Sequence, residues 1–103
     1  MSTLMNKQQE LHASFLAFCD NVYYQPPESI KMQYPAIRYT RSDIRNTFAT
    51  DNIYRQSHFY EVTVIDYDPD SEIVEKISKL PKVRFNRHYT LEGLNHDVFT
   101  IYY

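Results

Sequence analysis

Four carboxylate residues stand at alternate positions in the second half of the chain, namely Asp66, Asp68, Asp70 and Glu72. Alternate carboxylates open calcium-binding loops, where they supply oxygen ligands to the ion. The rest of such a loop is missing, because Pro69 interrupts it, no glycine provides the sharp turn, and Ile77 stands where the bidentate glutamate belongs. The pattern therefore favours the start of a helix over a cation site.

Two histidines and an aspartate, His88, His96 and Asp97, suggest a metal site or an acid–base pair. Facing strands would bring the two histidines close together. A zinc ion needs three or four protein ligands, and the sequence offers no convincing third one. Cys19 is the only cysteine, which excludes an internal disulfide and a multi-cysteine zinc site. We expect these histidines to serve hairpin packing or subunit contact, with no metal bound.

The cluster of Arg84, Arg87, His88 and Tyr89 resembles the side chains that small ribosome-dependent RNA-cleaving toxins use on a sheet. Such enzymes are usually strongly basic, since they dock on RNA phosphates. This chain has a net charge of -2, and its only glycine is Gly93, so the glycine-rich phosphate loops cannot be built. We therefore expect no enzyme and no cofactor, and keep the toxin-like enzyme as an alternative.

Length and composition indicate one domain over residues 1–103. Ten residues are tyrosine, more rings than so small a core holds, so some are expected to face another chain. No apolar run reaches the ~20 residues of a membrane span, and residues 1–10 lack the apolar stretch of a secretion signal. The sequence predicts a protein that stays inside a cell, or inside a particle assembled there.

The first half of the chain is predicted to hold a helix, a strand and a long loop. The helix runs from about Thr3 to Asn21, capped by Ser2 or Thr3, and the strand covers Ala36–Thr40. The loop Arg41–Gln56 lacks a clear period, and we expect it to be mobile until a partner orders it. Its candidate contact residues are Arg41, Ile44, Arg45, Phe48, Ile53, Tyr54 and Arg55.

The second half predicts a strand over His58–Asp66, then a helix capped by Asp68 with a buried stripe of Ile73, Ile77 and Leu80. Two further strands are expected at about Lys82–Tyr89 and His96–Tyr102. The fold class is α+β, in the order α-β-β-α-β-β. A small antiparallel or mixed sheet of about four strands would be packed by two helices.

Six short segments in order resemble the tail-terminator (tail-completion) proteins of long-tailed bacteriophages. They are Tyr34-Pro35-Ala36-Ile37, Asp51-Asn52, Val62-Thr63-Val64-Ile65-Asp66, Pro69-Asp70-Ser71, Arg87-His88-Tyr89 and Leu94-Asn95-His96-Asp97-Val98-Phe99. The resemblance covers about two-thirds of the chain. It implies an α/β subunit of a hexameric ring that caps the tail tube, stops its polymerisation and joins the tail to the head connector.

The same resemblance implies the partners. They are further copies of the chain, the tail tube protein and the head-closure or connector protein, and genomic DNA would pass through the pore without specific binding. The protein would lie at the tail–neck junction of the virion, after assembly in the host cytoplasm. Another head–tail joining protein, such as a head-closure protein, is the alternative.

A head-to-tail ring requires two different complementary patches on each subunit. The sequence offers an acidic set and a basic set separated by about a dozen residues. The acidic set is Asp68, Asp70 and Glu72, and the basic set is Arg84, Arg87 and His88.

Overall fold

A computed structural model describes residues 6–27 and 29–102, without the side chains of Ile53 and Tyr54. Within these residues the element order is α1 (Lys7–Leu16), β1 (Val22–Tyr24), β2 (Ala36–Ala49), β3 (Asn52–Asp66), α2 (Glu72–Ser78), β4 (Val83–Leu91) and β5 (Leu94–Tyr102). The described strands form one mixed sheet in the order β1-β2-β3-β5-β4, in which only the β1–β2 pair is parallel. The predicted α+β class is confirmed, but the sheet has five strands where about four were expected.

The additional strand is β1, which the sequence pattern did not reveal. It pairs Val22, Tyr23 and Tyr24 with Ile37, Arg38 and Tyr39 of β2. Three residues after a helix carry no recognisable alternation, and the pairing depends on residues fifteen positions further along the chain. A tertiary contact therefore creates this strand.

Helix α1 is shorter than predicted at its C-terminal end. Asn6 caps its start in a reciprocal capping box, in which the Gln9 N–H donates to Asn6 Oδ1 at 2.8 Å and the Asn6 N–H donates to Gln9 Oε1 at 3.1 Å. The predicted caps Ser2 and Thr3 lie outside the described residues. The helix ends at Leu16, because the N–H groups of the next turn fold back on the Phe15 carbonyl.

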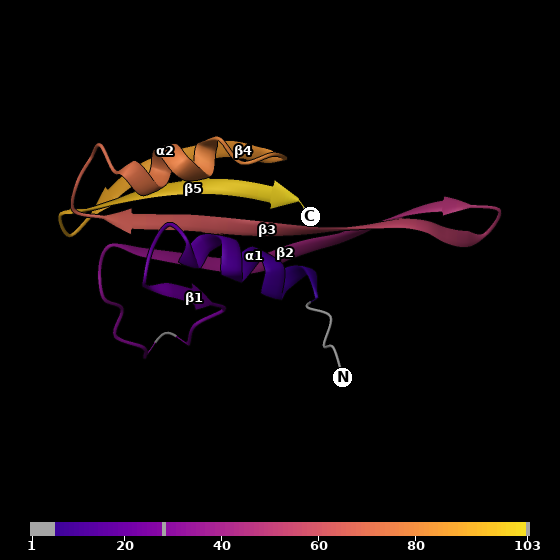
Figure 1. The fold of residues 1–103 in the computed structure, drawn as a ribbon, viewed down its shortest axis with the longest axis horizontal. Coiled ribbons are helices and arrows are strands. Elements are labelled where there is room, and N and C mark those ends of the chain that lie inside the picture. Colours follow the sequence, from indigo (N-terminus) through magenta and orange to yellow (C-terminus); the bar gives the residue numbers. More distant parts are fainter. Residues whose placement is uncertain (1–5, 28, 103) are drawn as a thin grey trace.

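The segment predicted as a mobile loop is instead the outer part of a long β-hairpin, so the loop prediction is wrong. Thr50 and Asp51 form a two-residue turn with φ of 53° and 65°, the positive values that a tight hairpin turn requires. Pairing of β3 with β5 starts only at Phe59. Beyond that point β2 and β3 run on as a two-stranded extension, which Figure 1 shows projecting past the rest of the sheet. We call residues 44–58 the arm.

One core lies between the two helices and one face of the sheet. Side chains of alternate strand residues enter it, as the period of two requires. Its buried members are Leu11, Phe15, Cys19, Ile37, Tyr39, Tyr60, Val62, Val64, Ile73, Ile77, Phe99 and Ile101. The opposite face of the sheet, which we call the helix-free face, presents the other parity.

Tyr39 lies at the centre of this core, with none of its surface exposed. Its ring packs edge-on against Phe15, with centroids 5.1 Å apart, and its hydroxyl accepts a hydrogen bond from Gln8 Nε2 at 2.7 Å. The same hydroxyl lies 2.6 Å from His12 Nδ1, to which it donates when that nitrogen is unprotonated. Burial raises the pKa of Tyr39 to about 12. The residue thus ties α1 to β2 through both ring and hydroxyl.

Helix α2 begins later than predicted, and its cap is Ser71, not Asp68. Ser71 Oγ accepts a hydrogen bond from the Ile73 N–H at 3.3 Å. The Asp68 carboxylate instead accepts from the Asp70 N–H at 2.9 Å, which makes an Asx turn that competes with helix formation. The predicted stripe is confirmed, since Ile73 and Ile77 are buried and Leu80 packs against them in part.

The C-terminal strands are confirmed as the antiparallel hairpin of β4 and β5, joined at Glu92 and Gly93 with φ of 53° and 78°. Both strands run within about two residues of the predicted limits. In the described part of the chain no helix is long and apolar enough to cross a membrane.

Candidate protein-interaction surfaces

The arm is the first candidate surface, because the rest of the described fold leaves its side chains uncovered. Phe48 is 62% exposed and Ile44 is 41% exposed. Arg45 pairs with Asp43 at 2.9 Å and lies over the Phe59 ring, with 4.5 Å from its guanidinium carbon to the ring centroid. Of the other predicted contact residues, Arg41 lies exposed at the base of the arm and Arg55 is exposed within it, while the side chains of Ile53 and Tyr54 lie outside the described residues.

Cross-strand polar contacts support the arm from within. Gln56 Nε2 donates to Asn46 Oδ1 at 3.0 Å, and His58 Nε2 lies 2.9 Å from Gln56 Oε1. A two-stranded hairpin alone is marginally stable in water, because it has no third strand or helix to bury its side chains. A hairpin that exposes Phe48 and Ile44 on such a support is therefore suited to bind a partner.

The acidic set lies where β3 ends and α2 begins. Asp68, Asp70 and Glu72 are all exposed. The Asp66 carboxylate accepts a hydrogen bond from the Asp68 N–H at 3.0 Å, so two successive Asx turns fix the backbone here. The structure thus keeps the predicted acidic residues together in one ordered turn, which we call the acidic turn (residues 66–72).

The basic set is divided between two faces of the sheet. A register shift between Phe85 and Arg87 places Arg84, opposite Thr100, and Arg87, opposite Val98, on the helix-free face. His88 stands opposite Asp97 and so lies on the other side. The expectation that all three residues form one patch is wrong, because the sequence spacing does not reveal the bulge.

The two histidines also lie on opposite faces, which contradicts the expectation that the strands bring them together. His88 is opposite Asp97, and its Nε2 lies 3.2 Å from Asn95 Oδ1. His96 is buried on the helix-free face, where its ring stacks on Tyr89 with centroids 4.6 Å apart. A search of the described residues finds no group of three metal-binding side chains.

Asp97 is a buried charge whose effect on stability depends on pH. Burial raises the pKa of the Asp97 carboxyl, and the nearby His88 and His96 oppose that rise. A carboxyl with a raised pKa binds protons more tightly in the folded state, so its ionisation reduces stability as pH rises above the unfolded value of about 4. We expect Asp97→Asn to raise the free energy of unfolding at pH 7, and to lose this advantage below pH 4. Urea unfolding of both proteins across pH measures the difference, and an advantage that grows on acidification would contradict this account.

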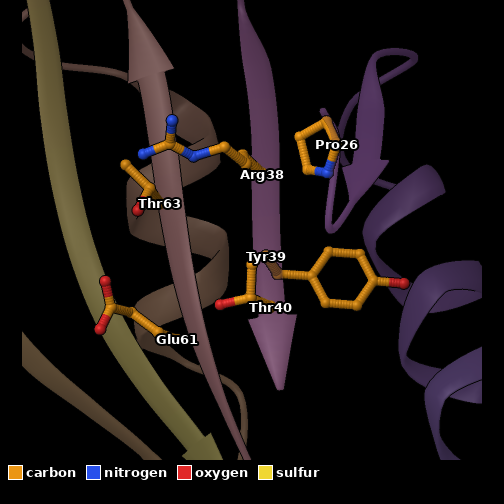
Figure 2. A pocket seen from close by; sticks show the side chains of 6 residues that line it. All are labelled: Pro26, Arg38, Tyr39, Thr40, Glu61 and Thr63. Atoms are coloured by element: carbon orange, nitrogen blue, oxygen red, sulfur yellow. The ribbon is translucent and has the colours of Figure 1, made fainter. Parts of the chain in front are cut away.

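The helix-free face carries two hollows. The smaller, of about 250 Å³, is lined by Pro26, Arg38, Tyr39, Thr40, Glu61 and Thr63. Figure 2 shows the Arg38 and Thr63 side chains on one side of the sheet while the Tyr39 ring points toward α1. Arg38 and Glu61 are its charged residues, and they do not form a nucleophile–base arrangement.

The larger hollow, of about 450 Å³, is a groove between the base of the arm and the start of β4. Three cationic side chains line it, those of Arg45, Lys82 and Arg84. Phe59 and Tyr102, stacked with centroids 5.5 Å apart, form part of its wall. The sequence analysis missed Lys82, Phe59 and Tyr102, because only the β3–β5–β4 pairing brings residues from these distant positions together.

The sequence matches no protein-family model and no curated protein sequence. The candidate surfaces are therefore the arm, the acidic turn and the basic groove, and none of them carries a set of side chains arranged for catalysis.

Proposed function

We propose that this protein is a phage tail terminator, which forms a ring on the end of the tail tube, ends tube polymerisation and joins the tail to the head connector. The arm carries this proposal, since it is a projecting hairpin with apolar side chains that the described fold does not cover. The resemblance between residues 34 and 99 and tail-terminator proteins supports the same function.

In this proposal the arm binds the tail tube protein. Ile44 and Phe48 supply the apolar contacts, and the hydrogen-bonded pairs between β2 and β3 hold them at a fixed spacing. Prior order in a binding segment reduces the entropy lost on binding. The body of the subunit, with its acidic and basic surfaces, remains available to neighbouring subunits.

The division of β4 residues counts against the RNA-cleaving alternative. An acid–base enzyme of that kind needs its arginine, histidine and tyrosine to converge on one phosphate. Here Arg87 and His88 project from opposite faces of the sheet. Hydrolysis of RNA by the purified protein that disappears in a His88→Ala variant would contradict the proposed structural role.

Tube assembly in the presence of the protein tests the function directly. We expect the cognate tail tube protein to form short tubes of uniform length when the purified protein is present, and long tubes when it is absent. Electron microscopy should show a ring of about six subunits with a central pore at one tube end. Unchanged tube growth, with binding to heads instead, would assign the protein to head closure.

A further inference from the structure

The basic groove holds more cationic charge than the described fold neutralises. Arg45 is paired with Asp43, whereas Lys82 and Arg84 have no carboxylate partner among the described residues. The Lys82 ammonium lies over the Tyr102 ring, 5.5 Å from its centroid. This contact holds the cation beside the hollow without cancelling its charge.

The aromatic wall gives the groove a defined shape. Arg45 lies over Phe59, Phe59 stacks on Tyr102, and Lys82 lies over Tyr102, so two cations flank a pair of stacked rings. Because the stacked rings restrict one another, the cationic groups are held at fixed places along the hollow. Such a groove is suited to a short acidic segment.

The acidic turn provides a segment of matching charge. Asp66 and Asp68 each accept a backbone hydrogen bond, which fixes the turn, while the carboxylates of Asp70 and Glu72 have no partner in the described part of the chain. Both of these residues are exposed. The turn is therefore an ordered, projecting acidic segment.

The groove and the turn lie at opposite ends of the sheet. Along β3, Phe59 borders the groove and Asp66 begins the turn, and the strand rises about 23 Å between them at about 3.3 Å per residue. Figure 1 shows the end of β3 and the start of β4 at opposite ends of the body. The turn of one subunit therefore does not reach its own groove.

We propose that the basic groove of each subunit binds the acidic turn of a second copy of this chain. Two different complementary patches at opposite ends of a subunit give a head-to-tail contact, and repeated contacts of this kind close into a ring when the rotation permits. The inference rests on the ring of the proposed function and names the surfaces that join its subunits.

Charge reversal on each surface separately provides the test. One variant carries Lys82→Glu with Arg84→Glu, so that its groove and its turn are both acidic. The other carries Asp70→Lys with Glu72→Lys, so that its turn and its groove are both basic. These positions avoid the Asp66 and Asp68 carboxylates, which hold the turn, and circular dichroism checks that both variants fold.

We expect each variant alone to remain monomeric at concentrations where the unmodified protein forms rings, as measured by sedimentation velocity in low salt. An equimolar mixture should form rings again, because each groove then meets a turn of opposite charge in an alternating arrangement. A chain with all four substitutions should also assemble. The control Lys31→Glu with Lys76→Glu alters the net charge as much as the groove variant does, and should assemble normally.

Rings formed by both single-surface variants, or a mixture that stays monomeric although both variants fold, would overturn the groove–turn contact. This result differs from failure of the proposed function, which would appear as an unmodified protein that neither forms rings nor limits tube length. A ring that persists in the variants and still caps tubes would retain the function and place the subunit contact elsewhere.

Discussion

Shortening the arm will abolish control of tube length without unfolding the protein. The variant replaces residues 46–56 with an Asn-Gly turn between Arg45 and Ser57, which pair in the native register. It removes Phe48 and the turn at Thr50 and Asp51 but leaves the core and the basic groove in place. Loss of one well-buried interface residue costs about 2 kcal/mol, or roughly a thirtyfold loss of affinity, and removal of the whole arm end should cost more.

The measurements are the tube-length distribution by electron microscopy and the binding of the variant to preformed tubes. A matched control, Thr50→Asn with Asp51→Gly, introduces the same turn residues at the full length of the arm. Asn-Gly suits the two positive φ angles there, so the control should fold at least as well as the native chain and limit tube length normally. Tubes of native length with the shortened arm would show that the tube binds another surface.

Truncation of Tyr39 will have the largest effect on stability of any single change that we consider. Tyr39→Ala removes a fully buried ring that packs against Phe15, Tyr24 and Tyr60, and should cost about 3 to 5 kcal/mol. Domains of this kind have only about 5 to 15 kcal/mol in total. The variant should therefore be partly unfolded at physiological temperature.

Tyr39→Phe separates the contribution of the hydroxyl from that of the ring. It keeps the packing but leaves Gln8 and His12 without their shared partner, and should cost about 1 to 2 kcal/mol. Urea unfolding followed by circular dichroism measures both differences. Equal losses for the two variants would mean that the ring contributes little, which the buried contacts of Tyr39 do not allow.

Local patterns were sufficient for the second half of the chain. Alternation of β-branched residues predicted the inner part of β3, and the period of Ile73 and Ile77 predicted the buried side of α2. The Glu92-Gly93 pair marked the turn between β4 and β5. In each case the signal lies within a few residues, because one face of the element is buried and the other is solvated.

The arm shows where such patterns fail. Both of its faces are exposed, so burial imposes no alternation on residues 44–56, and the strand is defined by hydrogen bonds to a partner segment instead. The same reason explains the missed strand β1, whose parallel pairing depends on residues beyond two prolines. Propensity describes a single segment, whereas strand pairing is a property of two.

The sequence by itself determined the α+β class, the main core residues, the acidic turn and the presence of cationic residues on β4. Only the tertiary structure decided which of these residues share a surface. The bulge between Phe85 and Arg87 sets the faces of the β4 side chains, and pairing of β3 with β5 and β5 with β4 joins Phe59, Tyr102 and Lys82 into the groove. A one-residue shift in strand register moves a side chain to the other face, and residues far apart in sequence determine that register.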